Sequence, residues 1–227
     1  MRTKAIILKK QNTNEYDQLV SCYTEEFGKV TAVAKSVLKP SSIQVMHLDI
    51  FNLVDFDLIL GRGMPIITGA QAEAVHPNLK NDLPSLAIAY FFAEVVDKIA
   101  FDYQKDMEIW SFLTTVLSDL NYKGHPCFNK DDPCSYLRDK QVEFMNILGY
   151  APNLGECAFC SASTKGNLMA YSIEARGAIC QDCFLDGRQG VVLKNGVWQN
   201  PAVMGALFEG LAERKLSSLN FLKNVLE

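Results

Sequence analysis

Apolar and polar residues alternate along short segments of the first 75 residues, which is the pattern of half-buried β-strands. Glycine-containing turns at residues 27–29 and 61–63 separate some of these segments. Five short strands in this length predict a small closed barrel, such as an OB-fold, over residues 1–78. The predicted strands are residues 4–10, 19–24, 30–34 and 50–60, and a last one that starts at residue 66. In the fourth strand Val54, Phe56, Leu58 and Leu60 share one face, and Asp55, Asp57 and Ile59 share the other.

From about residue 80 the apolar spacing changes to the period of helices. Asp82 is a favourable N-cap, and Pro84 suits the first turn of a helix over residues 83–101. That helix is apolar on nearly every side as far as Glu94, so we expect it to be central. Further apolar faces predict helices over residues 107–120, 137–148, 203–211 and 219–225, the last capped by Ser217 or Ser218. The predicted fold is therefore α+β and multidomain, with a helical domain over residues 79–227.

Four cysteines carry the clearest chemistry in the helical half. Cys157 and Cys160 form one C-x-x-C pair, Cys180 and Cys183 form a second, and residues 161–179 lie between them. Each pair sets two sulfurs on one tight turn, and two such turns can close a tetrahedral four-thiolate zinc site. Four thiolates leave no open coordination position, so we expect one structural Zn²⁺ in a finger over residues 153–186. The alternatives are a finger that has lost its metal and a pair of disulfides.

The other three cysteines lack metal-ligand spacing. Cys22 lies in an apolar stretch and is expected in the core. Cys127 and Cys134 lie in a polar loop, where exposed bystanders are expected and zinc-adjacent or redox-active thiols are the alternatives. An odd number of cysteines and the lack of an apolar run at the N-terminus favour a cytoplasmic protein with reduced thiols. The longest apolar run, residues 84–93, is too short to cross a membrane.

Charge is unevenly distributed along the 227 residues, whose net charge is −4. Residues 1–42 hold seven Lys or Arg against four Asp or Glu, and residues 81–227 hold thirteen against eighteen. The N-terminal excess of positive charge favours that region as the one that contacts nucleic acid. The chain has no phosphate-binding loop, no G-x-S-x-G and no H-E-x-x-H, which argues against an NTPase, a serine hydrolase and a zinc protease. We therefore expect a protein that is not an enzyme.

Two composite motifs resemble the RecO family of bacterial recombination mediators. Residues 14–35 resemble the first hairpin of the family, and residues 61–71, with Gly61-Arg-Gly63, resemble its last barrel strands. Residues 148–157 and 171–180 resemble the flanks of its zinc finger. The resemblance covers residues 1 to about 185, and the remainder matches only in being helical.

The resemblance implies an N-terminal OB-fold, a helical middle and a zinc finger. It implies binding to single- and double-stranded DNA and annealing of complementary strands. It also implies association with RecR and with the C-terminal tail of single-strand-binding protein, so that RecA loads onto coated DNA, in the cytoplasm at the nucleoid. This chain departs from the family after Lys35, where a run of basic residues is reduced to Lys39. Fewer phosphate contacts predict DNA affinity that is either weaker or supplied by a partner.

The candidate DNA contacts are cations of the predicted barrel: Lys9, Lys10, Lys29, Lys35, Lys39 and Arg62. Tyr16 and Tyr23 could stack on bases, but we expect both in the core. Lys105, Arg138 and Lys140 are candidates for binding an acidic, apolar-ended tail. Two other functions stay open, a zinc-stabilised adaptor without independent DNA binding and a small zinc-dependent hydrolase.

Overall fold

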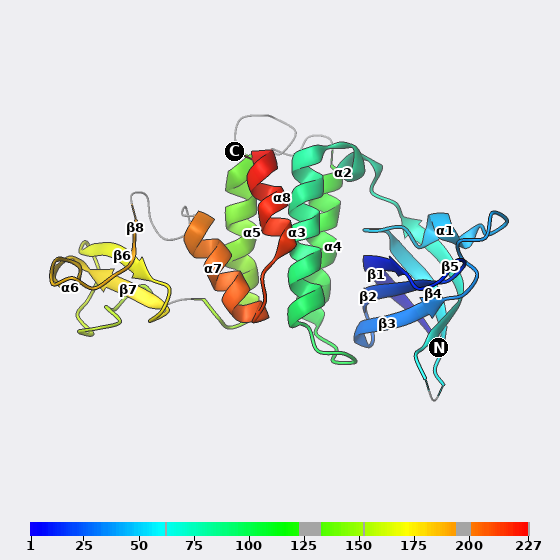
Figure 1. Cartoon of the computed structure of the whole chain (residues 1–227), viewed down its shortest axis with the longest axis horizontal. Coiled ribbons are helices and arrows are strands. Elements are labelled where there is room, and N and C mark those ends of the chain that lie inside the picture. Colours follow the sequence, from blue (N-terminus) through cyan, green and yellow to red (C-terminus); the bar gives the residue numbers. More distant parts are fainter. Residues whose placement is uncertain (62, 123–132, 152, 194–200, 227) are drawn as a thin grey trace. The chain divides into compact units, whose positions relative to one another are not determined.

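The computed structural model describes residues 1–61, 63–122, 133–151, 153–193 and 201–226 (Figure 1). The chain forms two compact units. The first comprises Met1–Cys134 and Leu216–Glu227, and the second comprises Ser135–Lys215. No described helix has both the length and the apolar character that crossing a membrane requires.

The N-terminal strands form a closed five-stranded barrel, as the sequence predicts. They are β1 (Arg2–Asn12), β2 (Gln18–Thr24), β3 (Gly28–Ala34), β4 (Leu53–Ile59) and β5 (Ile66–Ala74). The order around the barrel is β1-β2-β3-β5-β4, and β4 closes it by pairing antiparallel with β1. β3 and β5 pair in parallel, and the other neighbours pair antiparallel. This barrel is the OB-fold.

The strand alternation predicts the barrel core correctly. Val54, Phe56 and Leu58 of β4 are buried in it, beside apolar residues of the other strands. Leu60 was predicted on the same face but is half exposed, because β4 ends at Ile59. The short helix α1 (Gln44–His47) lies between β3 and β4 and was not predicted.

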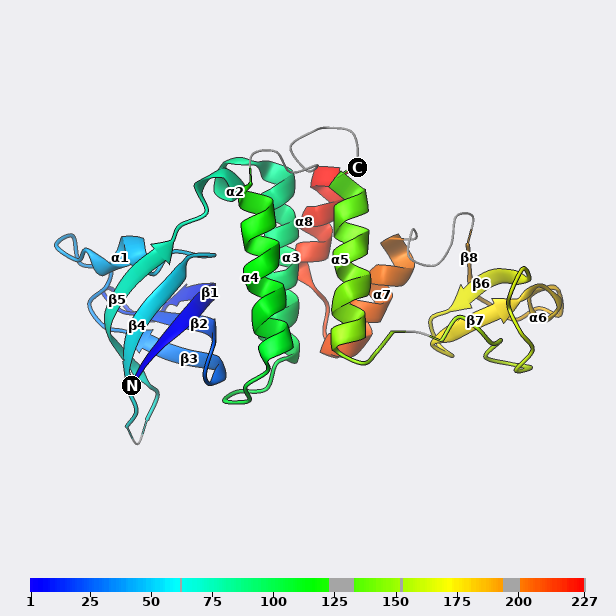
Figure 2. The same ribbon diagram turned by 180° about the vertical axis from the view of Figure 1, so that it is seen from behind.

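Helices of the first unit follow the barrel: α2 (Pro77–Asn81), α3 (Leu83–Ile99), α4 (Met107–Asn121) and α8 (Ser217–Leu226). α3 packs against α4 and α8, and the three lie side by side in Figures 1 and 2. The Asp82 carboxylate accepts a hydrogen bond from the Ser85 amide, which confirms it as the N-cap of α3. α3 is central, as predicted, because it also contacts β1 and β2. Asp97 on α3 accepts hydrogen bonds from Ser21 Oγ and, through its carbonyl, from Lys29 Nζ.

In its described residues, the second unit combines three helices with a small sheet. Its elements are α5 (Pro133–Ile147), β6 (Leu168–Ser172), β7 (Gly177–Cys180), α6 (Gln181–Leu185), β8 (Val191–Val192) and α7 (Pro201–Ala212). The strands pair in the order β7-β6-β8. Tyr171 of β6 and Val203 of α7 share one buried apolar cluster, and Phe144 of α5 stacks on Phe208 of α7. The cysteine-bearing segment therefore packs on α7 through ordinary apolar contacts.

Candidate metal centre and nucleic-acid interface

The four paired cysteines converge on one point. The Sγ atoms of Cys157, Cys160, Cys180 and Cys183 all lie within 4.8 Å of one another. The Sγ atoms of Cys160 and Cys180 are 3.7 Å apart. A tetrahedron with metal–sulfur bonds of about 2.3 Å has edges of about 3.8 Å, so this spacing fits a four-thiolate metal site. The four cysteines are thus positioned to hold a metal ion.

Backbone hydrogen bonds bring together the two C-x-x-C turns, the first knuckle at Cys157–Cys160 and the second at Cys180–Cys183. The Ala158 amide donates to the Ala178 carbonyl at 2.9 Å, which ties the first knuckle to β7. Cys180 precedes α6, and its sulfur accepts from the Cys183 amide. Gly177 permits this approach, since a Cβ on it would lie 2.8 Å from the Cβ of Ala158. A glycine at this point of the β6–β7 hairpin is therefore a packing requirement of the metal site.

The surroundings of Cys157 favour its thiolate. Burial raises the pKa of this thiol, but backbone amide donors, including those of Cys180, Phe159 and Cys160, lower it to about 6. The thiolate is the form that binds a metal. The local backbone therefore supports metal binding by this side chain.

Cys22 has a different environment from the four ligands. It is fully buried in the barrel core and donates to the Val30 carbonyl, which confirms the predicted core position. Burial raises the pKa of its thiol far above the ordinary value, so it stays protonated. Cys127 and the side chain of Cys134 lie outside the described residues.

Two of the six candidate DNA-contact cations are held by partners within the protein. Lys10 Nζ lies 2.8 Å from Asp49 Oδ1, and its side chain is only 17% exposed. Asp49 also pairs with Lys80 of α2, so this cluster joins the barrel to a helix. Lys29 Nζ donates to the Asp97 carbonyl, and it lies 3.3 Å from Asp102.

Three other candidates form no ion pair within the described part of the chain. Lys9, Lys35 and Lys39 are exposed, and none forms an ion pair with any carboxylate of the described residues. Lys9 lines a groove formed by residues of β1, β2, β3 and α3. Lys39 Nζ lies 5.5 Å from the centre of the Tyr16 ring. Arg62 lies outside the described residues.

The two tyrosines differ from each other. Tyr23 is buried, its hydroxyl donates to the Asp106 carbonyl at 3.2 Å, and burial raises its pKa to about 12. The predicted core position of Tyr23 is therefore confirmed. The core prediction for Tyr16 is wrong, because this residue is 40% exposed on the loop between β1 and β2. The alternating pattern stops in this polar loop, so it gives no guide to which side the ring faces.

The candidates for binding a tail lie on several elements. Lys105 is exposed just before α4. Arg138 and Lys140 are half-buried on α5, where Lys140 pairs with Glu143 at 2.9 Å. All three are therefore at or near the surface, but Lys140 is already neutralised in part.

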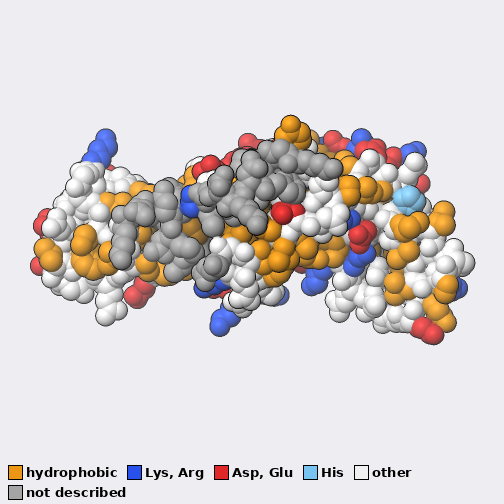
Figure 3. Space-filling view, turned by 90° about the horizontal axis from the view of Figure 1, so that it is seen from above, with side chains coloured by type: hydrophobic (Ala, Val, Ile, Leu, Met, Phe, Trp, Pro, Cys, Tyr) orange, Lys and Arg blue, Asp and Glu red, His pale blue; other side chains and the backbone are white. Residues whose placement is uncertain are grey.

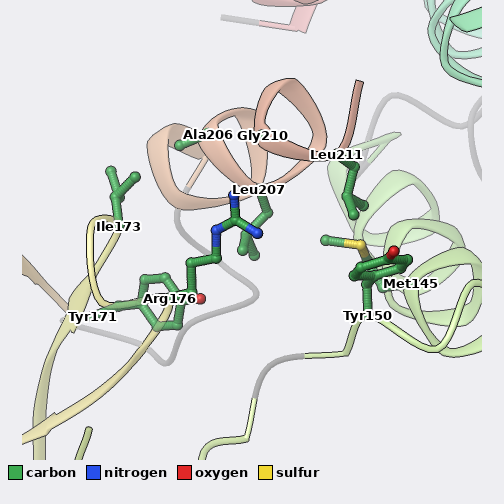
Figure 4. A pocket seen from close by; sticks show the side chains of 9 residues that line it. All are labelled: Met145, Tyr150, Tyr171, Ile173, Arg176, Ala206, Leu207, Gly210 and Leu211. Atoms are coloured by element: carbon green, nitrogen blue, oxygen red, sulfur yellow. The ribbon is translucent and has the colours of Figure 1, made fainter. Parts of the chain in front are cut away.

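An apolar groove of about 170 Å³ in the second unit was not predicted (Figure 4). Arg176 reaches from the β6–β7 turn toward α7, and its φ of 49° is unusual for a residue that is not glycine. The Tyr171 hydroxyl is buried with no hydrogen-bond partner in the described part of the chain. The sequence feature that could have indicated this groove is an arginine directly before the hairpin glycine, Arg176-Gly177. The groove is lined by Met145, Tyr150, Tyr171, Ile173, Arg176, Ala206, Leu207, Gly210 and Leu211.

Comparison with known families covers both halves of the chain. Residues 1–76 match the family model described as "Recombination protein O N terminal", and residues 80–217 match "Recombination protein O C terminal". The chain belongs to the RecO family. A relative from Desulfitobacterium hafniense (strain DSM 10664 / DCB-2), named DNA repair protein RecO, is 29% identical, with 96% of this chain and 76% of the relative aligned. A RecO from Moorella thermoacetica (strain ATCC 39073 / JCM 9320) is 27% identical, with 99% and 91% aligned.

The RecO family matches cover the barrel, the cysteine cluster and the apolar groove. The N-terminal RecO match includes the whole barrel and its free cations. The C-terminal RecO match includes the cysteine cluster and the apolar groove. The resemblance seen in the sequence motifs is thereby confirmed for both halves.

Proposed function

We propose that this member of the RecO family is a non-enzymatic mediator of recombinational DNA repair. The observation that carries the proposal is the match of both RecO models to a chain whose N-terminal strands close into an OB-fold barrel. OB-folds bind oligonucleotides on one barrel face and its loops. Relatives named DNA repair protein RecO support the same role. The proposed activities are binding to single- and double-stranded DNA, annealing of complementary strands, and help with RecA loading together with RecR at the nucleoid.

The proposed DNA-binding domain is the barrel of residues 1–78, joined to a helical domain over residues 79–227. Lys9, Lys35 and Lys39 are the favoured phosphate contacts, because all three are exposed and none forms an ion pair with a carboxylate of the described residues. Lys10 and Lys29 are weaker candidates, since a phosphate would have to displace Asp49 or Asp102. Arg62 remains a proposed phosphate contact because it stands between two glycines in the sequence.

The proposed metal is one structural Zn²⁺, held by the four cysteines of a finger over residues 153–186. Four sulfur ligands at tetrahedral spacing support zinc, which prefers this donor set in structural sites. Such a site stabilises the fold around it and leaves no position for a water molecule. This arrangement disfavours the zinc-dependent hydrolase as an alternative.

DNA binding measured at two salt concentrations tests the proposal. Three phosphate contacts on a single strand give a salt slope of about −2, so affinity should fall by roughly 16-fold between about 50 and 200 mM salt. Fluorescence anisotropy with a labelled single strand and with a duplex would measure this fall. If the purified chain binds neither DNA at the lower salt, the adaptor without independent DNA binding becomes the better account.

The second unit is the proposed site for the C-terminal tail of single-strand-binding protein. An acidic tail with an apolar end requires an apolar pocket that has a cation beside it. The groove around Arg176 offers this combination, and no acidic residue is among its lining residues. Arg138 and Lys140 of the same unit remain proposed contacts for the acidic part of the tail, and Lys105 of the first unit remains a separate candidate.

Titration of a labelled tail peptide tests this assignment. Arg176→Gln should weaken peptide binding by about tenfold, the effect of losing one charged hydrogen bond of about 1.4 kcal/mol. Lys165→Gln is the matched control, because Lys165 is an exposed cation of the same unit outside the groove. Equal affinity of the two variants for the peptide would contradict the groove as the site.

A further inference from the structure

The loop between β1 and β2 is held rigidly beside the segment that follows β3. Asn14 Oδ1 accepts hydrogen bonds from the amides of Tyr16 and Asp17, at 2.9 and 2.7 Å. Asp17 Oδ1 accepts from the Ser36 amide at 2.6 Å, and the Tyr16 carbonyl accepts from the Leu38 amide at 3.0 Å. The backbone of Tyr16 is therefore fixed from both sides, although the residue lies in a loop.

This loop presents an aromatic ring and a cation together. Tyr16 is 40% exposed, and Lys39 Nζ lies 5.5 Å from the centre of its ring. Lys35, which directly follows β3 and precedes Ser36, is also exposed. Hydrogen bonds from Ser36 and Asn14 lower the pKa of Asp17, so its carboxylate stays charged and keeps its role as the anchor of the loop.

Other aromatic–cation pairs in the described residues have different settings. Lys140 lies over Tyr136, but Lys140 also pairs with Glu143. Arg188 lies over Phe159, which belongs to the first cysteine knuckle. The Tyr16–Lys39 pair is on an OB-fold barrel, at the loop between its first two strands, and this loop is one that OB-folds use for oligonucleotides.

We infer that Tyr16 stacks on one unpaired base while Lys39 contacts an adjacent phosphate, so that the barrel prefers single strands to duplex. Stacking needs an open base face, and the bases of a duplex already cover one another. The inference rests on the DNA binding proposed above and adds a residue that selects the strand form. It also accounts for a site with one cation after Lys35, because stacking adds affinity that does not depend on charge. Asp17 is a positioning residue that acts through the loop.

Binding of the full chain to three labelled probes tests this inference. The probes are a single strand, the same strand with abasic positions, and a blunt duplex of equal length. Tyr16→Leu should weaken binding to the single strand by at least about fivefold, from a stacking energy of roughly 1–3 kcal/mol per base. It should leave the abasic and duplex affinities and the salt slope unchanged, whereas Tyr16→Phe should bind the single strand like the unmodified chain.

Two further variants separate stacking from charge and from nonspecific effects. Lys39→Gln should weaken binding to all three probes and reduce the single-strand salt slope by about 0.7. Tyr122→Leu is the matched control, because Tyr122 is an exposed tyrosine at the end of α4. Single-strand affinity that is unchanged by Tyr16→Leu, or a loss of equal size on all three probes, would overturn the inference and leave the proposed function standing. An unmodified chain that binds none of the probes would overturn both.

Discussion

The carboxylate of Glu94 joins two helices that are far apart in the sequence. Glu94 lies on α3 and accepts hydrogen bonds from the amides of Ser217 and Ser218, the first residues of α8. It also accepts from Ser217 Oγ at 2.7 Å and pairs with Lys98. The N-terminal amides of α8 are therefore capped by a residue of another helix, whereas the sequence predicted a cap from Ser217 or Ser218 itself.

Replacing Glu94 should destabilise the chain in a pH-dependent way. Burial raises the pKa of this carboxyl, but hydrogen bonds from Lys98, Ser218 and Ser217 outweigh burial and lower the pKa to about 2. The charged form therefore stabilises the fold above the ordinary pKa of about 4.5, and that stabilisation is lost as the pH falls toward 2. Glu94→Gln should reduce the free energy of unfolding by roughly 1 kcal/mol at neutral pH, the usual size of a lost cap.

Urea unfolding of both proteins at several pH values would measure this difference. The two curves should converge as the pH falls from about 5 to about 2. A difference that is constant over this range would show that the charge of Glu94 is not the cause. Lys98→Gln removes a neighbouring charge without removing the cap, so its effect at neutral pH should be smaller.

At the scale of the elements, the β6–β7 hairpin determines whether the cysteines can meet. Gly177→Val should reduce metal affinity, because a side chain there would push against Ala158 in the first knuckle. Since metal binding is coupled to folding, the melting temperature should fall as well. Elemental analysis should find about one zinc per unmodified chain and less in this variant. Gly210→Ala is the control, since a Cβ on Gly210 meets no atom within 4 Å. Full zinc content in Gly177→Val would contradict the packing role.

Elements with strong periodicity were predictable, and contacts between distant segments were not. The alternation in β4 and the apolar faces of α3 and α4 follow directly from the sequence. α1 and α2, of four and five residues, are too short to show a helical period. The cap on α8 comes from a residue 123 positions away. The groove around Arg176 is likewise assembled from segments between residues 145 and 211.

The site residues show the same division. The spacing of the four cysteines was sufficient to predict that they meet, because each pair needs only one tight turn. The exposure of Tyr16 was not predictable, since it depends on hydrogen bonds that backbone amides around the loop donate to the side chains of Asn14 and Asp17. Likewise, the sequence alone could not distinguish Lys10, which pairs with Asp49, from Lys35, which is exposed and forms no ion pair with the described carboxylates.

At the scale of the whole molecule, positive and negative side chains are intermixed. Lys and Arg side chains are scattered among acidic ones on the face shown in Figure 3. With a net charge of −4, the chain as a whole repels phosphate, so any DNA affinity must come from a local group of cations. The reduced number of basic residues after Lys35 makes each remaining cation of the barrel more important.

The salt dependence of single-strand binding by a variant with Lys9→Gln, Lys35→Gln and Lys39→Gln tests the central claim most directly. Each lost phosphate contact removes about 0.7 from the slope, so the triple variant should lose about 2. Its melting temperature should stay unchanged, because exposed charges contribute little to stability. Lys165→Gln should keep the full slope. A triple variant that folds normally and keeps the slope of the unmodified chain would contradict the barrel as the DNA-binding site.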